Sequence, residues 1–267
     1  MDSVKKKAKE LLENQSVNLI IGYGEGSDQN VRTIFISQAD EVDQLIYDER
    51  CVQNLAFYLM KHEVKHLGKL GIVAPLPVMR SILQIASECQ IKEENLVVLG
   101  ITSKGELIET TGFKDIENYI ASCELDLPAN EKEIIAKLDA MTVEERWTFW
   151  TNELSRCIKC YACRAACPMC YCTRCQVECN NPQWVTVEAT PMGNLEWHFM
   201  RAMHLTGRCV NCGECARACP LKIPINLLTY KTVMTVKSQF NMVAGTLANM
   251  DSVLSSYKTD DKENFIR

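Results

Sequence analysis

The sequence predicts two domains, an α/β domain over residues 1–140 and a cysteine-rich domain over residues 141–240, followed by a tail over residues 241–267. The length of 267 residues suits two domains of ordinary size. In the first half, apolar segments alternate with helical patterns, which is typical of an α/β layer. Twelve of the 15 cysteines fall between Cys157 and Cys219, so we expect the second half to have a chemistry of its own.

The first domain is expected to contain four strands, because four short apolar runs are bounded by turn residues. They cover residues 17–21, 31–36, 70–74 and 96–99. The glycine-rich stretch from Gly22 to Gly26 follows the first of these runs. Its glycine spacing departs from that of a dinucleotide-binding loop, so we expect a turn there.

Helical patterns occur on both sides of the expected domain boundary. In the first domain they cover residues 5–13, 51–65 and 78–89. In the second half, the stretch from Thr142 to Glu145 matches an N-terminal capping box. Helices are also expected over residues 129–139, over 194–205, and from Pro224 to about residue 239.

Two cysteine runs share one spacing, C-x2-C-x2-C-x3-C-P, from Cys157 to Pro168 and from Cys209 to Pro220. In bacterial ferredoxins with this spacing, three close thiolates bind one [4Fe–4S] cluster and the fourth cysteine of each run binds the other. The pattern predicts a first cluster on Cys157, Cys160, Cys163 and Cys219, and a second on Cys209, Cys212, Cys215 and Cys167. The expected fold is a two-[4Fe–4S] ferredoxin-like α+β domain with a helical insert and a helical C-terminal extension.

Structural zinc is the alternative for these eight cysteines. Zinc ribbons pair two Cys-x2-Cys knuckles, and they do not need a third cysteine followed by Cys-Pro. Residues 141–240 carry a net charge of +4 in a chain whose net charge is −5. Two clusters with four thiolates each would bring about −4 and offset this excess, so the charge does not call for a nucleic-acid partner.

Four further cysteines lie in the insert between the two runs: Cys170, Cys172, Cys175 and Cys179. The last three repeat the ending of a cluster run, but the first is one residue too close. A third iron–sulfur cluster, a zinc site and free thiols remain open for them. The three cysteines outside this region are expected to be small buried side chains; they are Cys51, Cys89 and Cys123.

The residues from His62 to His66 spell H-E-x-x-H, a zinc-hydrolase motif when it lies on a longer helix with a further ligand. Gly68 follows at once and no third ligand is apparent, so we expect a solvated helix end. His198 and His204 are expected to pack or hydrogen-bond near a cluster, where such bonds tune its potential. No catalytic residue is predicted.

No segment has the roughly 18 to 20 consecutive apolar residues that a membrane-spanning helix needs, and the N-terminal stretch lacks the apolar run of a secretory signal. We therefore expect a cytoplasmic protein without a membrane span. Because disulfides seldom persist in that compartment, its cysteines are expected to bind metal or carry out redox chemistry.

Residues 156–172 and 204–209 resemble the dicluster segment of iron–sulfur subunits related to formate dehydrogenase and deazaflavin-reducing hydrogenase beta subunits. Residues 51–59, 71–74 and 96–100 are similar to the α/β domain of that family. The resemblance implies electron transfer within a soluble complex. Its partners would be hydrogenase, formate dehydrogenase, flavoprotein or heterodisulfide-reductase-like subunits.

The sequence departs from this family at the ends of two expected strands. Relatives typically carry Arg-Pro-Cys-Asp where this chain has Pro75 to Val78, and a cysteine where it has Thr102-Ser103; only Arg80 persists. The α/β domain is therefore interpreted as a docking scaffold, and the chain as an electron-transfer subunit. The alternatives are a flavin-containing oxidoreductase subunit with its own active site in the α/β domain, and a metal-stabilised regulatory or binding module.

Overall fold

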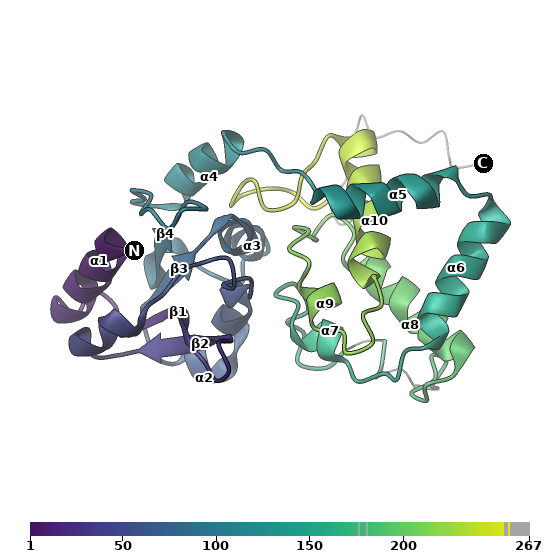
Figure 1. Ribbon diagram of the computed structural model, residues 1–267, viewed down its shortest axis with the longest axis horizontal. Coiled ribbons are helices and arrows are strands. Elements are labelled where there is room, and N and C mark those ends of the chain that lie inside the picture. Colours follow the sequence, from purple (N-terminus) through teal and green to yellow (C-terminus); the bar gives the residue numbers. More distant parts are fainter. Residues whose placement is uncertain (176, 180, 254–255, 257–267) are drawn as a thin grey trace.

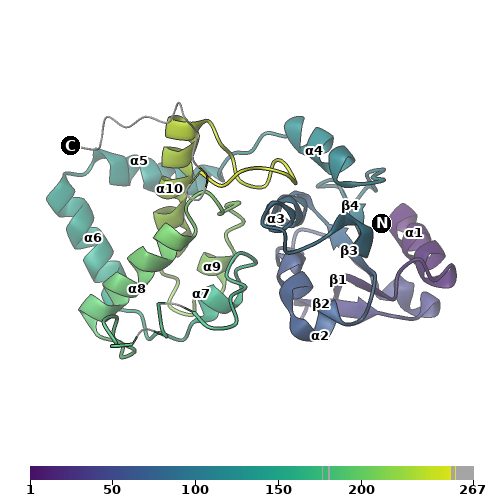
Figure 2. The ribbon, with the colours of Figure 1, turned by 180° about the vertical axis from the view of Figure 1, so that it is seen from behind.

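Two lobes lie side by side in the molecule, one built around a β-sheet and the other built from helices (Figure 1). The computed structural model describes residues 1–175, 177–179, 181–253 and 256. The chain passes from the sheet lobe to the helical lobe after α4 (Phe113–Ala121), and it returns toward the sheet lobe after α10 (Ile225–Phe240). The view from behind shows the same two connections (Figure 2).

The sheet has four strands in the order β2-β1-β3-β4. β1 (Leu19–Glu25) and β2 (Val31–Ile36) form an antiparallel hairpin. β3 (Leu70–Ala74) runs parallel to β1 on one side and to β4 (Leu96–Gly100) on the other. All five residues of β3 are buried, as expected for a central parallel strand that is covered on both faces. The four predicted strands are confirmed.

The turn predicted from Gly22 to Gly26 is wrong in its position, because Gly22 and Gly24 lie inside β1. A Cβ atom on Gly22 would lie 2.2 Å from Leu45 Cδ2, and one on Gly24 would lie 2.7 Å from Ile34 Cγ2. These glycines therefore let side chains of neighbouring segments approach the strand closely. The chain reverses only after β1 ends, beginning at Gly26.

The helices of the sheet lobe include α1 (Asp2–Glu13) and α3 (Leu76–Ser87), both of which were expected. α3 carries the chain from β3 to β4, and its first turn contains Pro77, a position where proline loses no helical hydrogen bond. Short 3-10 segments occur at η1 (Ala39–Gln44) and η3 (Glu93–Asn95).

The single helix predicted over residues 51–65 is wrong. This stretch contains the 3-10 segment η2 (Leu55–Met60) and the short helix α2 (His62–Lys65). Lys61 between them is extended, with ψ of 133°, and this interrupts the helical backbone. The side chain of Asn54 accepts a hydrogen bond from the Ala56 N–H, which fixes the start of η2.

The helical lobe is built from α10 and five further helices. They are α5 (Ala129–Ala140), α6 (Val143–Ser155), α7 (Ala162–Ala165), α8 (Pro191–His204) and α9 (Glu214–Arg217). The predicted capping box is confirmed, because the side chains of Thr142 and Glu145 each bond the other residue's N–H at the start of α6. α8 begins three residues earlier than predicted, where the Thr190 side chain accepts from the Gly193 N–H.

The α+β form expected for the cysteine-rich domain is not observed. After Gly100, the described part of the chain holds an isolated bridge between Ile101 and Leu107 and no strand. Helices flank the cysteine loops, and the loops bond some of their N–H groups to sulfur rather than to a ladder of carbonyls. α5 adds Leu138 to the core of this lobe, beside Trp150 and Leu154 of α6.

A half-buried ion pair joins the two lobes. Glu88, at the C-terminal end of α3, accepts hydrogen bonds of 2.8 and 2.5 Å from Arg208 and one of 2.5 Å from the Tyr171 hydroxyl. Apolar side chains extend the contact, because Met169 and Leu205 of the helical lobe belong to the core of the sheet lobe.

Candidate metal centre

The two cysteine runs fold into loops of the same shape. In each, the second and fourth residues after the first cysteine have left-handed backbones: Lys159 (φ 50°) and Tyr161 (φ 59°) in the first loop, Asn211 (φ 59°) and Gly213 (φ 77°) in the second. A left-handed backbone is costly for residues other than glycine, and such strain is concentrated at functional sites. The loops then enter α7 and α9, and these two short helices contact each other.

The same repetition appears in the hydrogen bonds to sulfur. The Lys159 N–H donates to Cys157 Sγ at 3.3 Å, and the Asn211 N–H donates to Cys209 Sγ at 3.4 Å. Both acceptors are the first cysteine of their run. An N–H donor stabilises negative charge on sulfur, so each loop is prepared for a thiolate at this position.

The structure brings together the four thiols expected to hold the first cluster. Burial raises the pKa of Cys163 to about 11; the charge of Arg201 opposes this rise, and the other three thiols of the expected set reinforce it. Cys219 belongs to the second run, so the set is crossed between the runs. Burial also raises the pKa of Cys157, to which the charges of Cys160 and Cys219 add.

The four thiols expected to hold the second cluster are also close together. Burial raises the pKa of Cys212 to about 12, and the charges of Cys167 and Cys209 add to this rise. Burial likewise raises the pKa of Cys215, and the same set reinforces the rise. Cys167 comes from the first run, so this set is crossed as well.

One face of α8 covers the first cysteine loop. Asn194 donates to the carbonyls of Leu154 and Cys157, at 3.1 and 2.7 Å. His198 Nε2 lies 3.3 Å from Cys157 Sγ. Arg201 donates to the Cys163 carbonyl at 3.0 Å.

Positions 194, 198 and 201 recur at helical spacing, so these three side chains share one face of α8. His198 was expected near a cluster. Asn194 and Arg201 were missed, although their spacing from His198 could have identified them. Burial, followed by the charges of Arg201 and Lys159, lowers the pKa of His198 to about 4, so its ring is neutral at pH 7.

The sheet lobe reaches the second cysteine loop through Arg80 of α3. Its guanidinium donates 2.7 Å hydrogen bonds to the carbonyls of Val210 and Ala244. Burial lowers the pKa of Arg80, while the neighbouring thiols of Cys209 and Cys212 raise it. A buried positive charge from the first lobe therefore lies beside the second set of thiols.

The insert cysteines divide into two groups. Cys170, Cys172 and Cys175 line one cavity, whereas Cys179 is exposed and does not line it. A hydrogen bond between the side chains of Cys170 and Cys167 lowers the pKa of Cys167 to about 6 despite its burial. The insert therefore adjoins the second set of thiols.

The eight cysteines of the two runs fit a pair of clusters by their donor chemistry and by the polar groups around them. Thiolates are the ligands that iron–sulfur clusters require. Two buried donors of Arg201, Nε and Nη1, have no partner, and the sulfides and thiolates of a cluster are acceptors. Among the described residues, no three His, Cys, Asp or Glu side chains are grouped to hold a single metal ion.

The other predicted sites lie apart from this centre. His62 and His66 are exposed, with their Nε2 atoms 2.8 Å apart at the short helix α2. Cys51 is buried and Cys123 is half-buried, but the prediction of burial is wrong for Cys89, which is exposed. Within the described ranges, no helix combines the length and the apolar character needed to cross a membrane.

Comparisons with known proteins identify relatives of part of the chain. No family model matches it. The F420-dependent formate dehydrogenase subunit beta of Methanocaldococcus jannaschii is 31% identical over 97 residues, or 36% of this chain and 25% of that protein. The F420-dependent formate dehydrogenase 1 subunit beta of Methanococcus maripaludis is 34% identical over 90 residues, or 34% of this chain and 21% of that protein.

This chain is related to the formate dehydrogenase beta subunits. The resemblance stated from the sequence is thereby confirmed. The matches span a quarter or less of the length of these curated relatives.

Proposed function

We propose that this chain is an iron–sulfur electron-transfer subunit of a multi-subunit oxidoreductase. One observation carries the proposal: two loops of the same shape bring their thiols together crosswise, in two sets of four. The first set is Cys157, Cys160, Cys163 and Cys219, and the second is Cys209, Cys212, Cys215 and Cys167. The relationship to formate dehydrogenase beta subunits supports the role.

A [4Fe–4S] cluster, when bound, exchanges one electron between its 2+ and 1+ states. The chain's own residues would hold and tune it. The cysteines supply four thiolates to each cluster, and the N–H groups of Lys159 and Asn211 stabilise charge on one sulfur of each set. The buried guanidinium of Arg201 lies beside thiols of both sets and offsets part of their negative charge.

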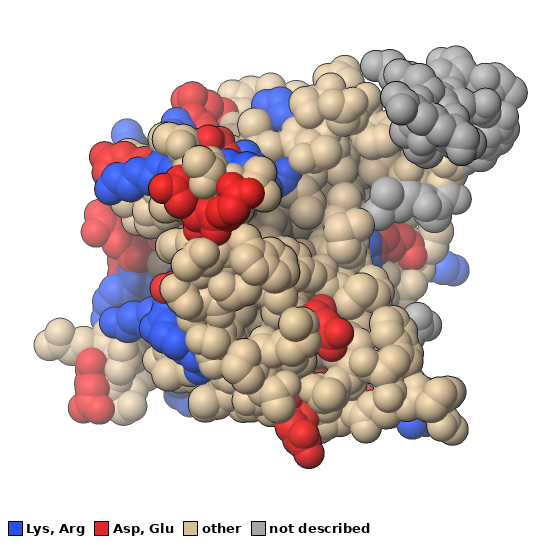
Figure 3. Space-filling view, turned by 90° about the vertical axis from the view of Figure 1, so that its right-hand side faces the viewer, with Lys and Arg blue, Asp and Glu red and all other residues tan. Residues whose placement is uncertain are grey.

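We propose that the partner is another oxidoreductase subunit of the kinds named above, in a cytoplasmic complex. The helical lobe exposes several large apolar side chains: Val143, Trp147, Ile158, Trp184, Val187 and Met192. Most of the lower face of this lobe carries few charged side chains (Figure 3). These exposed apolar side chains are available for contact with a partner subunit.

Anaerobic purification followed by iron and sulfide analysis tests the proposal. We expect at least about 8 iron atoms per chain, since each cluster contains four, and an electron paramagnetic resonance signal after reduction by dithionite. Cys160→Ala should remove about four irons. Cys89→Ala is the matched control, because Cys89 is also exposed and lies outside both runs. Iron-free protein, or full iron content in the Cys160 variant, would contradict the assignment.

The two alternatives predict other results. A flavin-containing subunit would show a flavin absorption band. The cavity beyond the ends of β3 and β4, lined in part by Tyr23, Ser103 and Cys212, has a volume of about 250 Å³, somewhat below the range of about 300–1,000 Å³ usual for ligand sites. A zinc-stabilised regulatory module would contain zinc and no acid-labile sulfide.

A further inference from the structure

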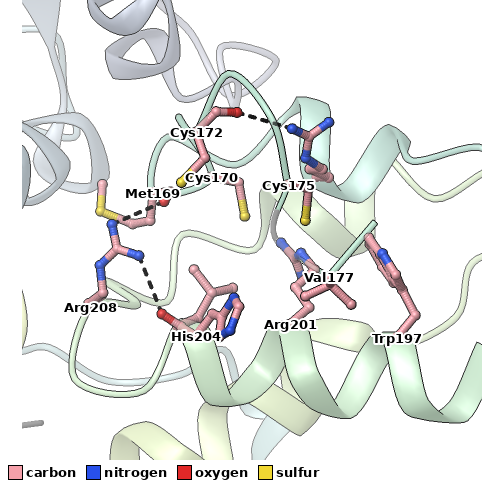
Figure 4. A pocket seen from close by; sticks show the side chains of 11 residues that line it. Met169, Cys170, Cys172, Cys175, Val177, Trp197, Arg201, His204 and Arg208 are labelled. Carbon is pink, nitrogen blue, oxygen red and sulfur yellow. Dashed lines mark hydrogen bonds between the residues drawn. The ribbon is translucent and has the colours of Figure 1, made fainter. Parts of the chain in front are cut away.

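A cavity of about 300 Å³ lies in the helical lobe, and the described residues that line it include none of the eight cysteines of the two crossed sets. Three of its lining residues are the insert cysteines Cys170, Cys172 and Cys175. The sulfur atoms of Cys170 and Cys175 point into it, toward Arg201 (Figure 4). This volume equals about ten water molecules at ~30 Å³ each, so the space is larger than one metal ion needs.

The cavity is positively charged where it meets the thiols. Three arginines line it: Arg164, Arg201 and Arg208. Arg208 is already paired with Glu88, and Arg164 donates to the Cys172 carbonyl at 3.0 Å.

Arg201 is different, because the residue is only 4% exposed and its Nη2 donates to the Cys163 carbonyl. Its Nε and Nη1 atoms have no partner. Buried polar groups in proteins are almost always hydrogen-bonded. Two unpartnered donors beside three thiols therefore indicate a ligand that carries negative charge and several acceptors.

The remaining walls are apolar and include Met169, Val177, Trp197 and Leu205. A hydrophilic anion would lose its hydration here, whereas a cluster spreads its charge over several sulfur atoms. Soft thiolate ligands select iron–sulfur clusters, zinc or cuprous ions. The size of the cavity favours the cluster over a single metal ion.

We propose that this cavity holds a third four-iron cluster, bound by Cys170, Cys172 and Cys175, with Arg201 donating to its sulfur atoms. Cys179 is not a ligand in this proposal, because it does not line the cavity. The Cys170 N–H donates to the Cys167 carbonyl at 3.1 Å, so the third cluster would lie next to the second. This inference rests on the proposed two-cluster function. It can be wrong while that function is correct.

The test is an iron and sulfide count on the anaerobically prepared full chain. We expect close to 12 irons per chain in the unmodified protein and close to 8 in Cys172→Ser, with the signals of the other two clusters retained. Cys179→Ser is the matched control from the same insert and should keep close to 12. Arg201→Met should retain the cysteine ligands but change the midpoint potential of the third cluster.

Each other outcome has a definite meaning. A count close to 8 in the unmodified protein overturns the third cluster and leaves the proposed function intact. A count below 8 contradicts the proposed function itself. One zinc per chain that disappears in Cys172→Ser overturns the identity of the bound group. A loss of four irons in Cys179→Ser overturns the three-cysteine ligand set. The count on the unmodified protein decides the question even if a variant fails to fold.

Discussion

Replacing His198 with leucine should lower the midpoint potential of the cluster on the first set of thiols. The ring is buried, with 1% of its surface exposed, and Nε2 lies 3.3 Å from Cys157 Sγ. Burial lowers the pKa of His198 to about 4, so at pH 7 the ring is neutral and carries one N–H. A thiolate can only accept a hydrogen bond, so this N–H is on Nε2. The bond is strengthened when the cluster gains an electron, and it therefore favours reduction.

The expected shift follows from the energy of one hydrogen bond. A hydrogen bond to a charged group contributes about 1.5–3 kcal/mol. The added electron is shared with the other thiolates and the sulfides, so only part of that energy, about 1 kcal/mol, depends on the redox state. A tenfold change in a one-electron equilibrium constant is about 1.4 kcal/mol or 59 mV. We therefore expect a decrease of about 40 mV.

An anaerobic redox titration monitored by electron paramagnetic resonance measures this shift. The cluster on the second set should keep its potential, because the nearest arginines and loop N–H groups are unchanged. His66→Leu is the control, since His66 is exposed and lies in the other lobe. His198→Gln can place an amide donor near the sulfur and should restore part of the shift. A His198→Leu protein with full iron content and unchanged potentials would refute the reasoning.

Three further predictions concern the lobe interface and the histidine pair. Arg80→Met leaves two buried carbonyls unpaired and should lower the free energy of unfolding by about 2–4 kcal/mol. The measurement is the temperature at which the visible absorption of the clusters is lost, which should decrease. Glu88→Gln should lower the thermal midpoint at pH 7. Burial disfavours the charge of Glu88, but the hydrogen bonds and charge of Arg208 outweigh this effect and hold the pKa of Glu88 below the usual value of 4.5. The stabilisation by ionised Glu88 is therefore complete above about pH 4.5. The difference in thermal midpoint between Glu88→Gln and the unmodified protein should shrink as the pH falls through the depressed pKa of Glu88. Replacing His62 and His66 with alanine should leave metal content unchanged, because both are exposed, at the start and just past the end of a four-residue helix.

The spacing of the cysteines predicted two loops of one shape, because each run is local in sequence and folds on its own into a short loop. The strands were predicted for the same reason: each is a continuous apolar run. The prediction of one helix over residues 51–65 failed, because apolar composition does not reveal the extended backbone of Lys61. The strand positions of Gly22 and Gly24 depend on Leu45 and Ile34, which lie elsewhere in the sequence.

The polar residues around the thiols were harder to predict, since their roles arise only when distant segments meet. Arg201 approaches Cys163, 38 positions earlier, and Arg80 bonds the carbonyl of Val210, 130 positions later. An arginine on an apolar helix such as α3 gives no indication of its partner. The cavity of the insert is a similar case, because the spacing of its cysteines left three explanations open. The unpartnered donors of Arg201 supply the further observation that favours a cluster.

The distribution of charge implies that the two sets of thiols are not equivalent. Arg80 acts on Cys209 and Cys212, and Arg201 lies beside thiols of both sets. The first set has Lys159 in place of a second arginine. Burial raises the pKa of Cys157, and the charge of Lys159 opposes this rise. Two unit charges about 6 Å apart interact by about 3 kcal/mol at an effective dielectric constant of ~20. Reduction adds a negative charge, which each set compensates with a cation of its own, and the sheet lobe supplies this cation to the second set through Arg80.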